Sequence, residues 1–237
     1  MKKKLGAIAS IALAALALVG CGDDGGASAP SGENANSVFH ETMTDDRDGR
    51  TYKTVVIGAQ TWMAENLDYE YKANDSTYGN WCYGNSADNC AKYGRLYSWA
   101  AAMDSATTGC GDDKACTASS EKVQGICPDG WHLPSKAEWD VLFTAVGGSS
   151  IAGTALKTSS GWTNGGNGSD TYGFSALPSG NRTSDGETNS AGNVAYFWSS
   201  SESAVYRAYS VVLNKGNGSI YLANDKGSGF AVRCVKD

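Results

Sequence analysis

The segment from Cys127 to Asp140 constrains the fold of this chain most, because it combines a turn, a short apolar strand and the start of a helix. Ser135 precedes Glu138 by three residues, the spacing of a capping box in which each side chain accepts a hydrogen bond from an otherwise unpaired backbone N–H. Apolar residues then recur at helical spacing: Trp139, Leu142, Phe143 and Val146. The sequence therefore predicts a helix that opens at Ser135 and stops at the glycine pair 147–148.

The first residues have the pattern of an export signal. Three lysines (Lys2–Lys4) precede an Ala/Leu/Ile run that is short for a membrane span and ends in Leu-Val-Gly-Cys21. This ending resembles the bacterial lipobox, in which the cysteine becomes the lipidated mature N-terminus. We therefore expect residues 1–20 to be a lipoprotein signal peptide and Cys21 to carry acyl chains such as palmitate. An ordinary signal peptide with an incidental cysteine is the alternative.

Residues 21–43 contain few apolar side chains and are expected to form a flexible tether. Gly22-Asp23-Asp24 resembles the acidic export signals of some Gram-negative surface lipoproteins, although acidic residues are common in any solvated linker. We expect the protein to be lipid-anchored in the cell envelope, in the outer membrane. If Gly22-Asp23-Asp24 is an export signal, the domain lies at the cell surface. The sequence leaves inner against outer membrane, and the leaflet, open.

Charge argues against one class of partner. Loss of Lys2, Lys3 and Lys4 with the signal peptide leaves 16 of the 19 basic residues against 25 acidic ones, a net charge of −9. No basic run occurs, so nucleic acid is not an expected partner. The rest of the chain, residues 44–237, has the length of a single domain.

Seven cysteines occur, and six remain if Cys21 is lipidated. An even number in an exported chain indicates disulfides rather than catalytic or metal-bound thiols. Spacing favours two local bridges, Cys82 with Cys90 and Cys110 with Cys116, which leaves Cys127 with Cys234, although the sequence alone does not prove this connectivity. A zinc site is the rival interpretation, but the chain lacks the paired Cys-x-x-Cys spacing and has only two histidines.

The remaining pattern predicts short elements between long loops. A turn at Asp48-Gly49 precedes an expected hairpin over residues 46–63, and Leu96, Trp99 and Met103 suggest a first helix over Tyr93–Met103. Residues 104–124 read as a stapled polar insertion and 158–192 as loops. Strands are expected at Val194–Ser200, Ala208–Leu213, Ser219–Leu222 and Gly229–Val235.

Five motifs occur in a fixed order: Gly58–Leu67, Tyr93–Trp99, Cys127–Trp139, Gly192–Glu202 and Gly229–Val235. Together they resemble the Fibrobacter succinogenes major paralogous domain family, from about residue 45 to the C-terminus. The region is more distantly similar to C-type lectin-like domains and to formylglycine-generating enzymes. The resemblance implies an α+β, C-type lectin-like fold: two helices flanking a small twisted antiparallel sheet, with long loops, disulfide staples, and the first and last strands together.

The resemblance also suggests glycan or surface-protein binding through the loops. The loops contain carboxylate and amide oxygens, which are ligands that Ca²⁺ takes, and two aromatic rings that could stack on a sugar. The candidate ligand-binding residues are Trp162, Tyr172, Asp170, Asn181, Asp185 and Glu187. Asn167 and Asn189 supply further amide oxygens. Calcium-dependent lectins carry Trp-Asn-Asp where this chain has Trp198-Ser-Ser-Ser-Glu202. Calcium therefore remains only a candidate cofactor, and ordinary solvated loop chemistry is the alternative.

Catalysis is not expected. A formylglycine-type oxidase needs two late cysteines and only Cys234 lies late, while His132 is expected to be packed rather than catalytic. A pair of carboxylates for glycoside cleavage stays open, and so does a structural envelope protein without a ligand. Five tryptophans are assigned to the core (Trp62, Trp99, Trp131, Trp139 and Trp198), and three aromatic residues to the surface (Trp81, Tyr83 and Trp162).

Overall fold

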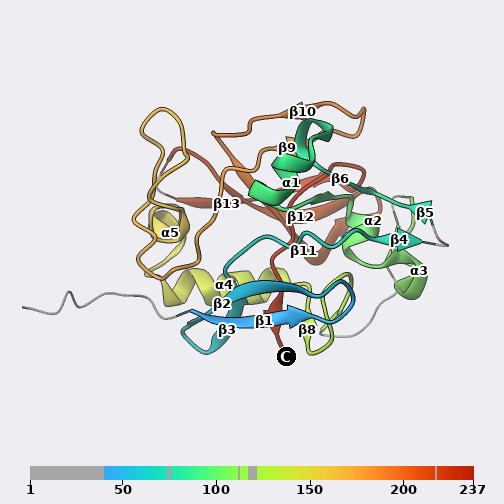
Figure 1. The fold of residues 1–237 in the computed structure, drawn as a ribbon, viewed down its shortest axis with the longest axis horizontal. Helices are drawn as coiled ribbons and strands as arrows, with labels where there is room; N and C mark the ends of the chain where they lie inside the picture. The colour runs from blue at the N-terminus through green and yellow to red at the C-terminus, as the bar shows by residue number, and fades with distance from the viewer. Residues whose placement is uncertain (1–39, 74–75, 112, 117–121, 217) are drawn as a thin grey trace, which may run out of the picture. The chain divides into compact units, whose positions relative to one another are not determined.

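The computed structural model describes residues 40–237 apart from 74–75, 112, 117–121 and 217 (Figure 1). The expected signal peptide, Cys21 and the tether as far as residue 39 lie outside the described residues. Strand pairing begins at Glu41, so residues 41–43, expected at the end of the tether, already belong to a strand. In the described part of the chain, no helix is long and apolar enough to cross a membrane.

The domain is a mixed α/β structure of short helices and antiparallel strands (Figure 1). Its first half contains β1 (Glu41–Asp45), β2 (Arg50–Ile57), β3 (Gln60–Met63), β4 (Lys72–Ala73), β5 (Ser76–Thr77), β6 (Asn80–Trp81), the 3₁₀ turn η1 (Tyr83–Asn85), α1 (Ala87–Tyr93), β7 (Leu96–Tyr97), α2 (Trp99–Ala102) and α3 (Ser105–Thr108). Its second half contains β8 (Trp131–His132), α4 (Lys136–Ala145), α5 (Ser149–Leu156), β9 (Asn181–Arg182), β10 (Thr188–Asn189), β11 (Ala195–Ala204), β12 (Arg207–Leu213), β13 (Ser219–Asp225) and β14 (Val235–Lys236).

Two antiparallel sheets form the frame. The larger has the order β1-β2-β3-β14-β8, and the other has the order β11-β12-β13. Val235 of β14 pairs with Trp62 of β3 and with His132 of β8, so the last strand lies between segments from the first half and the middle of the chain (Figure 1). The first and last strands are therefore brought into one sheet, as expected.

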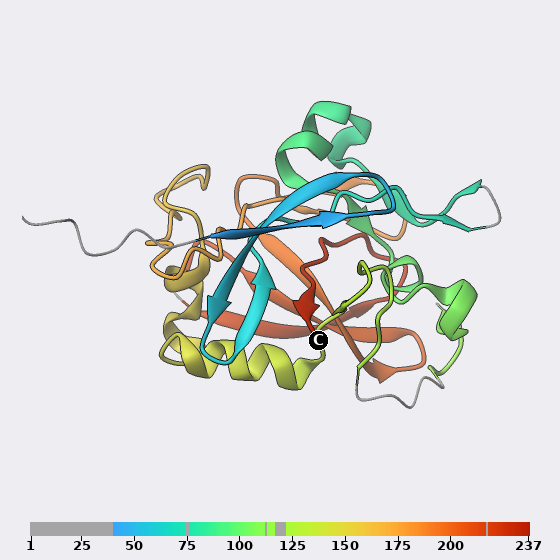
Figure 2. The same cartoon turned by 60° about the horizontal axis from the view of Figure 1, so that its bottom comes forward.

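Helix α4 forms as its local sequence predicts. Ser135 and Glu138 make both bonds of the capping box, and positive φ angles of 98° and 104° at Gly147 and Gly148 follow the helix end. The β2–β3 hairpin packs on this helix (Figure 2), where a Cβ added at Gly58 would lie 2.9 Å from the Cβ of Ala145. A side chain at residue 58 would therefore push the hairpin away from α4.

The centre of the domain is aromatic. All five tryptophans assigned to the core are buried, and the rings of Trp62 and Trp139 lie 4.7 Å apart between centroids. Phe174 and Phe197 meet Trp139 from the loop after α5 and from β11. The core thus joins the hairpin, α4 and the second sheet.

The expected first helix over Tyr93–Met103 is wrong. Helix α1 ends at Tyr93, because Gly94 adopts a φ of 73° and its N–H bonds the carbonyl of Cys90. The chain then extends, Leu96 pairs with Trp81, and a new short helix begins where the Ser98 hydroxyl accepts from the backbone N–H of Ala101. The burial pattern was therefore real, but it comes from a strand followed by a one-turn helix.

Two further boundaries differ from expectation. Helix α5 was not predicted, since Ser149–Leu156 follows the glycine pair directly and has no capping side chain at its start. The expected strand Gly229–Val235 makes only single bridges before β14, from Gly229, Phe230 and Ala231 to Arg182, Tyr97 and Phe197. That segment crosses between the two sheets instead of belonging to one, which is why it lacks a continuous ladder.

The six domain cysteines form the three bonds expected from their spacing. Cys82 bonds Cys90 beside α1, Cys110 bonds Cys116 in the insertion after α2, and Cys127 bonds Cys234. The last bond joins residues 107 positions apart in the chain and fixes the segment before β8 to the segment before β14.

Three buried cations hold the loops. Arg233 is fully buried and donates to the carbonyl oxygens of Met63, Phe174 and Ser175 and to the side chain of Asn66. Burial lowers the pKa of Arg233 to about 9, against the raising effect of Asp170 and Glu65. The guanidinium therefore remains charged at neutral pH and ties β3 to the loop after α5.

Two lysines act in the same way. Lys226 is fully buried and donates to the carbonyls of Gly111 and Lys114 and to the carboxylate of Glu202, with its ammonium 4.3 Å from the Trp99 ring centroid. Lys157 donates to the carbonyls of Asn214 (2.8 Å) and Gly216 (2.9 Å), and burial lowers its pKa. Each lysine thus gathers carbonyl groups of a loop around one charge.

We predict that the double variant Cys127→Ser/Cys234→Ser loses about 4.7 kcal/mol of unfolding free energy, because the chain-entropy model gives this value for a loop of about 100 residues. Urea denaturation of wild type and variant measures the difference. The matched variant Cys82→Ser/Cys90→Ser opens a loop of sequence separation 8 and should lose less. Equal losses for the two variants would contradict this explanation.

Candidate functional site

The structure removes Trp162 from the candidate ligand residues. Its side chain is only 6% exposed, and its indole N–H bonds the Thr158 hydroxyl (3.0 Å) and the Ala176 carbonyl (3.2 Å). The expectation of a surface position is wrong because residues 157–176 fold back on the core, with Lys157 bridged to Ala176. Trp162 therefore stabilises the loop from within and offers no ring face to a ligand.

The other members of that set belong to two separate segments. Asp170 accepts from the backbone N–H (2.8 Å) and hydroxyl (2.7 Å) of Ser175 and so closes the loop after α5, where half-buried Tyr172 packs against the core. Asn181, Asp185 and Glu187 lie on the β9–β10 hairpin, where a hydrogen bond from Thr183 lowers the pKa of Asp185. Among the described residues, no three His, Cys, Asp or Glu side chains come together as a possible metal site.

A cleft lies elsewhere, between β2, residues 64–68, α1 and the loop around Ser175. Its volume is about 280 Å³. Buried polar side chains form its floor: Tyr52, Asn66, Asp68 and Tyr93. Exposed charged side chains form its rim: Arg50, Lys53, Glu65 and Lys92. This combination of buried hydrogen-bonding groups and accessible charges makes the cleft the strongest candidate site in the domain.

Asp68 is the charged centre of the floor. Arg50 forms an ion pair with one carboxylate oxygen, and the Nε of Arg95 lies 3.4 Å from the other without a hydrogen bond. Burial raises the pKa of Asp68, while the two arginines oppose this effect. The backbone N–H of Asp68 donates to the hydroxyl of Tyr52 (3.1 Å), so the Tyr52 proton remains free to donate. Burial also raises the pKa of Tyr52, which keeps that proton in place.

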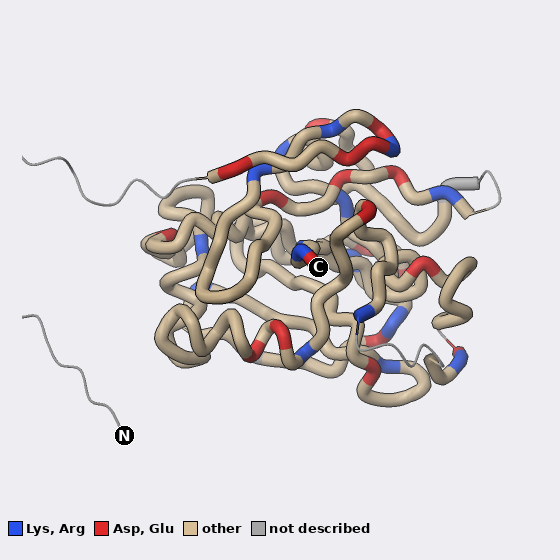
Figure 3. The backbone as a smooth tube through the Cα atoms, turned by 90° about the horizontal axis from the view of Figure 1, so that it is seen from below, with Lys and Arg blue, Asp and Glu red and all other residues tan. Residues whose placement is uncertain are grey.

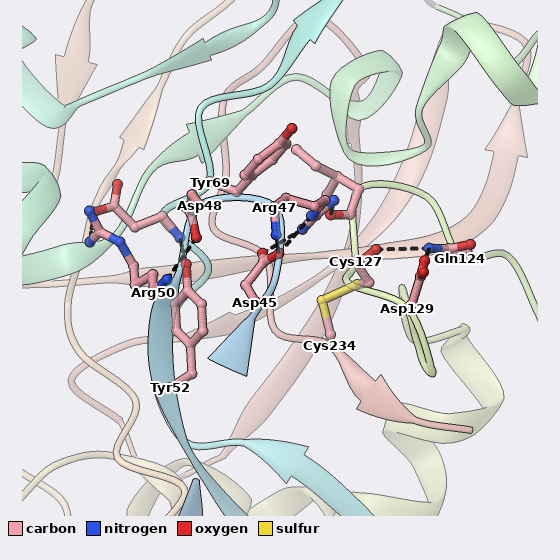
Figure 4. A network of polar contacts seen from close by, with 12 residues as sticks. Asp45, Arg47, Asp48, Arg50, Tyr52, Tyr69, Gln124, Cys127, Asp129 and Cys234 are labelled. Carbon is pink, nitrogen blue, oxygen red and sulfur yellow. Dashed lines mark hydrogen bonds and ion pairs between the residues drawn. A yellow bond between two sulfur atoms is a disulfide. The ribbon is translucent and has the colours of Figure 1, made fainter. Parts of the chain in front are cut away.

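Arg50 of the rim follows the β1–β2 turn, where acidic and basic residues gather (Figure 3). Arg47 makes a bidentate pair with buried Asp45 (2.7 and 2.8 Å), donates to the carbonyl of Ile126 and lies over the Tyr69 ring (Figure 4). Bidentate pairs of this kind combine strength with a fixed geometry. The Asp45–Arg47 pair fixes the turn, and the bond from Arg47 to the Ile126 carbonyl attaches the turn to the segment that contains Cys127. The backbone N–H of Arg50 donates to the Asp48 carboxylate.

Asn66 holds the cleft walls together. Its amide nitrogen donates to the Tyr93 carbonyl at the end of α1 (2.7 Å), and its oxygen accepts from Arg233 (2.6 Å). A Cβ at Gly94 would approach the Asn66 side chain to 2.7 Å, so a glycine is needed for α1 to pack this closely. The wall positions thus depend on Arg233 and on the disulfide-bonded α1 segment.

Sequence reasoning missed this cleft because its residues come from several segments that are far apart in the sequence. One signal was present: Glu65, Asn66 and Asp68 are polar residues inside the motif that follows the buried Trp62-Met63 pair. Polar residues directly after a buried strand either cap it or face a site.

The family model of the Fibrobacter succinogenes major domain matches residues 55–236. The chain belongs to this family. The match includes every cleft wall except the β2 residues before 55 and His40. No curated protein and no solved structure matches the chain significantly.

His132 of this Fibrobacter succinogenes major domain is packed, as expected, and lies between two carboxylates. Its ring nitrogens are 2.6 Å from Glu138 and 2.7 Å from Asp237, and its side chain is 2% exposed. Burial lowers the pKa of His132, but the bonds and charges of Glu138 and Asp237 outweigh this and raise it above 6.5. The Ser135 hydroxyl donates to Glu138 rather than to the histidine.

We predict that His132 and Glu138 make the stability of the domain depend on pH. A raised histidine pKa contributes stability that is complete below 6.5 and is lost as the pH rises through the folded-state value. Bonding to His132 and Ser135 lowers the pKa of Glu138 despite its burial, so its contribution is complete above 4.5 and is lost on acidification. The unfolding free energy should therefore be greatest between these two pH values.

Urea denaturation across this pH range measures the effect. His132→Gln should flatten the decline on the alkaline side, and His40→Gln, a change in the other histidine, should leave it in place. An unchanged alkaline decline in His132→Gln would contradict the assignment.

Proposed function

We propose that this protein is a non-enzymatic, lipid-anchored envelope protein whose lectin-like domain binds glycans in the cleft described above. The carrying observation is the floor of that cleft, which is lined by Tyr52, Asn66 and Asp68. Sugar hydroxyls both donate and accept hydrogen bonds, so they suit a floor that offers both kinds of group. The charged rim then excludes an apolar ligand.

Preorganisation supports the same proposal. The floor residues are fixed by Arg233, by the Tyr52–Asp68 bond and by the arginines around Asp68 before any ligand arrives. Groups that are already held lose little conformational freedom on binding. A scaffold of this kind serves recognition of a small polar ligand.

The lectin-like part of the proposal rests on topology. The first and last strands share a sheet, long loops join α5 to β11, and disulfides fasten segments outside the two main sheets. An oxidase of the formylglycine-generating kind is disfavoured because Cys234, the only late cysteine, is bonded to Cys127.

Glycan binding predicts a measurable role for the Tyr52 hydroxyl. Tyr52→Phe should weaken retention on the preferred polysaccharide about fivefold, the effect of one lost hydrogen bond of about 1 kcal/mol. Affinity electrophoresis against a polysaccharide panel, with calcium and with chelator, measures retention. Tyr206→Phe is the matched control, because Tyr206 is 63% exposed and does not line the cleft.

Absence of retention on every polysaccharide under both conditions would refute glycan binding. It would favour the alternative of a structural envelope lipoprotein without a ligand. Melting curves of both tyrosine variants check that folding is retained.

Lipid anchoring predicts a separate result. Cys21→Ala should move the protein from the membrane to the soluble fraction of lysed cells, because the acyl chains would be lost. Detergent extraction and fractionation with immunoblotting measure this. A Cys21→Ala protein that stays with the membrane would contradict the lipoprotein proposal, and protease treatment of whole cells tests surface exposure.

A further inference from the structure

The charge distribution of the cleft identifies the class of glycan. Resting on the proposed function, we propose that the cleft binds acidic polysaccharides, with sugar carboxylates at Lys53 and Lys92 and sugar hydroxyls on the floor. Lys53 lies on β2 and Lys92 in the last turn of α1, so the two ammonium groups come from different walls of the same cleft.

Both lysines are available for a ligand. Each is exposed, and neither forms an ion pair within the described residues, whereas Arg50 is already paired with Asp68. The ammonium of Lys92 lies 4.7 Å from the ring centroid of Tyr93, which orients it beside the floor. An exposed ammonium without a partner is free to exchange water for a carboxylate.

The surrounding charges favour an anion. Arg50 and Arg95 together balance Asp68, and Arg95 also lies 3.5 Å from Glu70. Glu65 is the remaining acid of the rim, and its carboxylate accepts from the backbone N–H of Lys53 (2.7 Å). His40, also in the lining, has its Nε2 2.7 Å from the carbonyl of Gly173. Two unpaired lysines therefore face one acid, in a chain whose net charge is −6.

This arrangement predicts opposite changes in glycan affinity for the lysine variants and for the Glu65 variant. Removing a lysine should weaken binding of an acidic glycan, whereas neutralising Glu65 should strengthen it. Exposed pairs are individually modest and are screened by salt, so each change should alter affinity about twofold to fivefold at low salt and less at high salt. A ligand held by the floor alone would respond to none of these changes.

Polygalacturonate and its fully methyl-esterified form are matched probes, because they share one backbone and differ in carboxylate charge. Alginate and its propylene glycol ester form a second pair. Affinity electrophoresis of the full domain compares wild type, Lys53→Ala, Lys92→Ala and Glu65→Gln, with Lys215→Ala as the control. Lys215 is exposed and lies in the β12–β13 turn, outside the cleft lining.

We expect stronger retention by at least one acid than by its ester, weaker retention of that acid in both cleft lysine variants, stronger retention in Glu65→Gln, and no change in Lys215→Ala. Equal retention of acid and ester, or binding of neutral glycans only, would overturn this inference and leave the proposed function standing. Equally strong retention on polyglutamate would overturn it in favour of an acidic protein ligand. No retention on any glycan would refute the proposed function itself.

Discussion

The position of Arg233 determines much of the rest of the structure. Its guanidinium is fully buried, and its partners are main-chain carbonyls and the amide of Asn66 rather than a carboxylate. A buried charge is tolerated only when its donors are satisfied, so β3, Asn66 and the loop at Ser175 must converge on it. Asn66 in turn holds the end of α1. The positions of the cleft walls therefore follow from the hydrogen bonds that satisfy this one buried charge.

Lys157 and Lys226 are also buried cations whose partners include main-chain carbonyl groups of loops. Loops rich in Gly, Ser and Asn bury little apolar surface, and their carbonyl groups lack the partners that a helix or sheet would supply. An ammonium group donates hydrogen bonds to several carbonyl groups in different directions, and the nearby rings of Trp162 and Trp99 add a favourable electrostatic contact. Long irregular segments thus acquire fixed positions without regular secondary structure.

Local signals in the sequence predicted those parts of the fold whose causes are local. The capping box of Ser135 and Glu138 defined α4, and cysteine spacing suggested the three disulfides. The predictions were wrong where tertiary contacts determine the end of a helix or the burial of a side chain. Gly94 ends α1 with a φ of 73° at a place where Asn66 leaves no room for a side chain, and Trp162 is buried because its loop folds back. The cleft was not predictable, since it joins residues between His40 and Leu177 that share no pattern.

The Lys226 site also shows how the domain fixes a loop with a charge that belongs to its own chain. Two loop carbonyls and the Glu202 carboxylate converge on its ammonium, a donor set similar to that of a bound divalent ion. Here the positive charge is covalently attached to the chain. A chelator cannot extract it, and dilution cannot lower its occupancy.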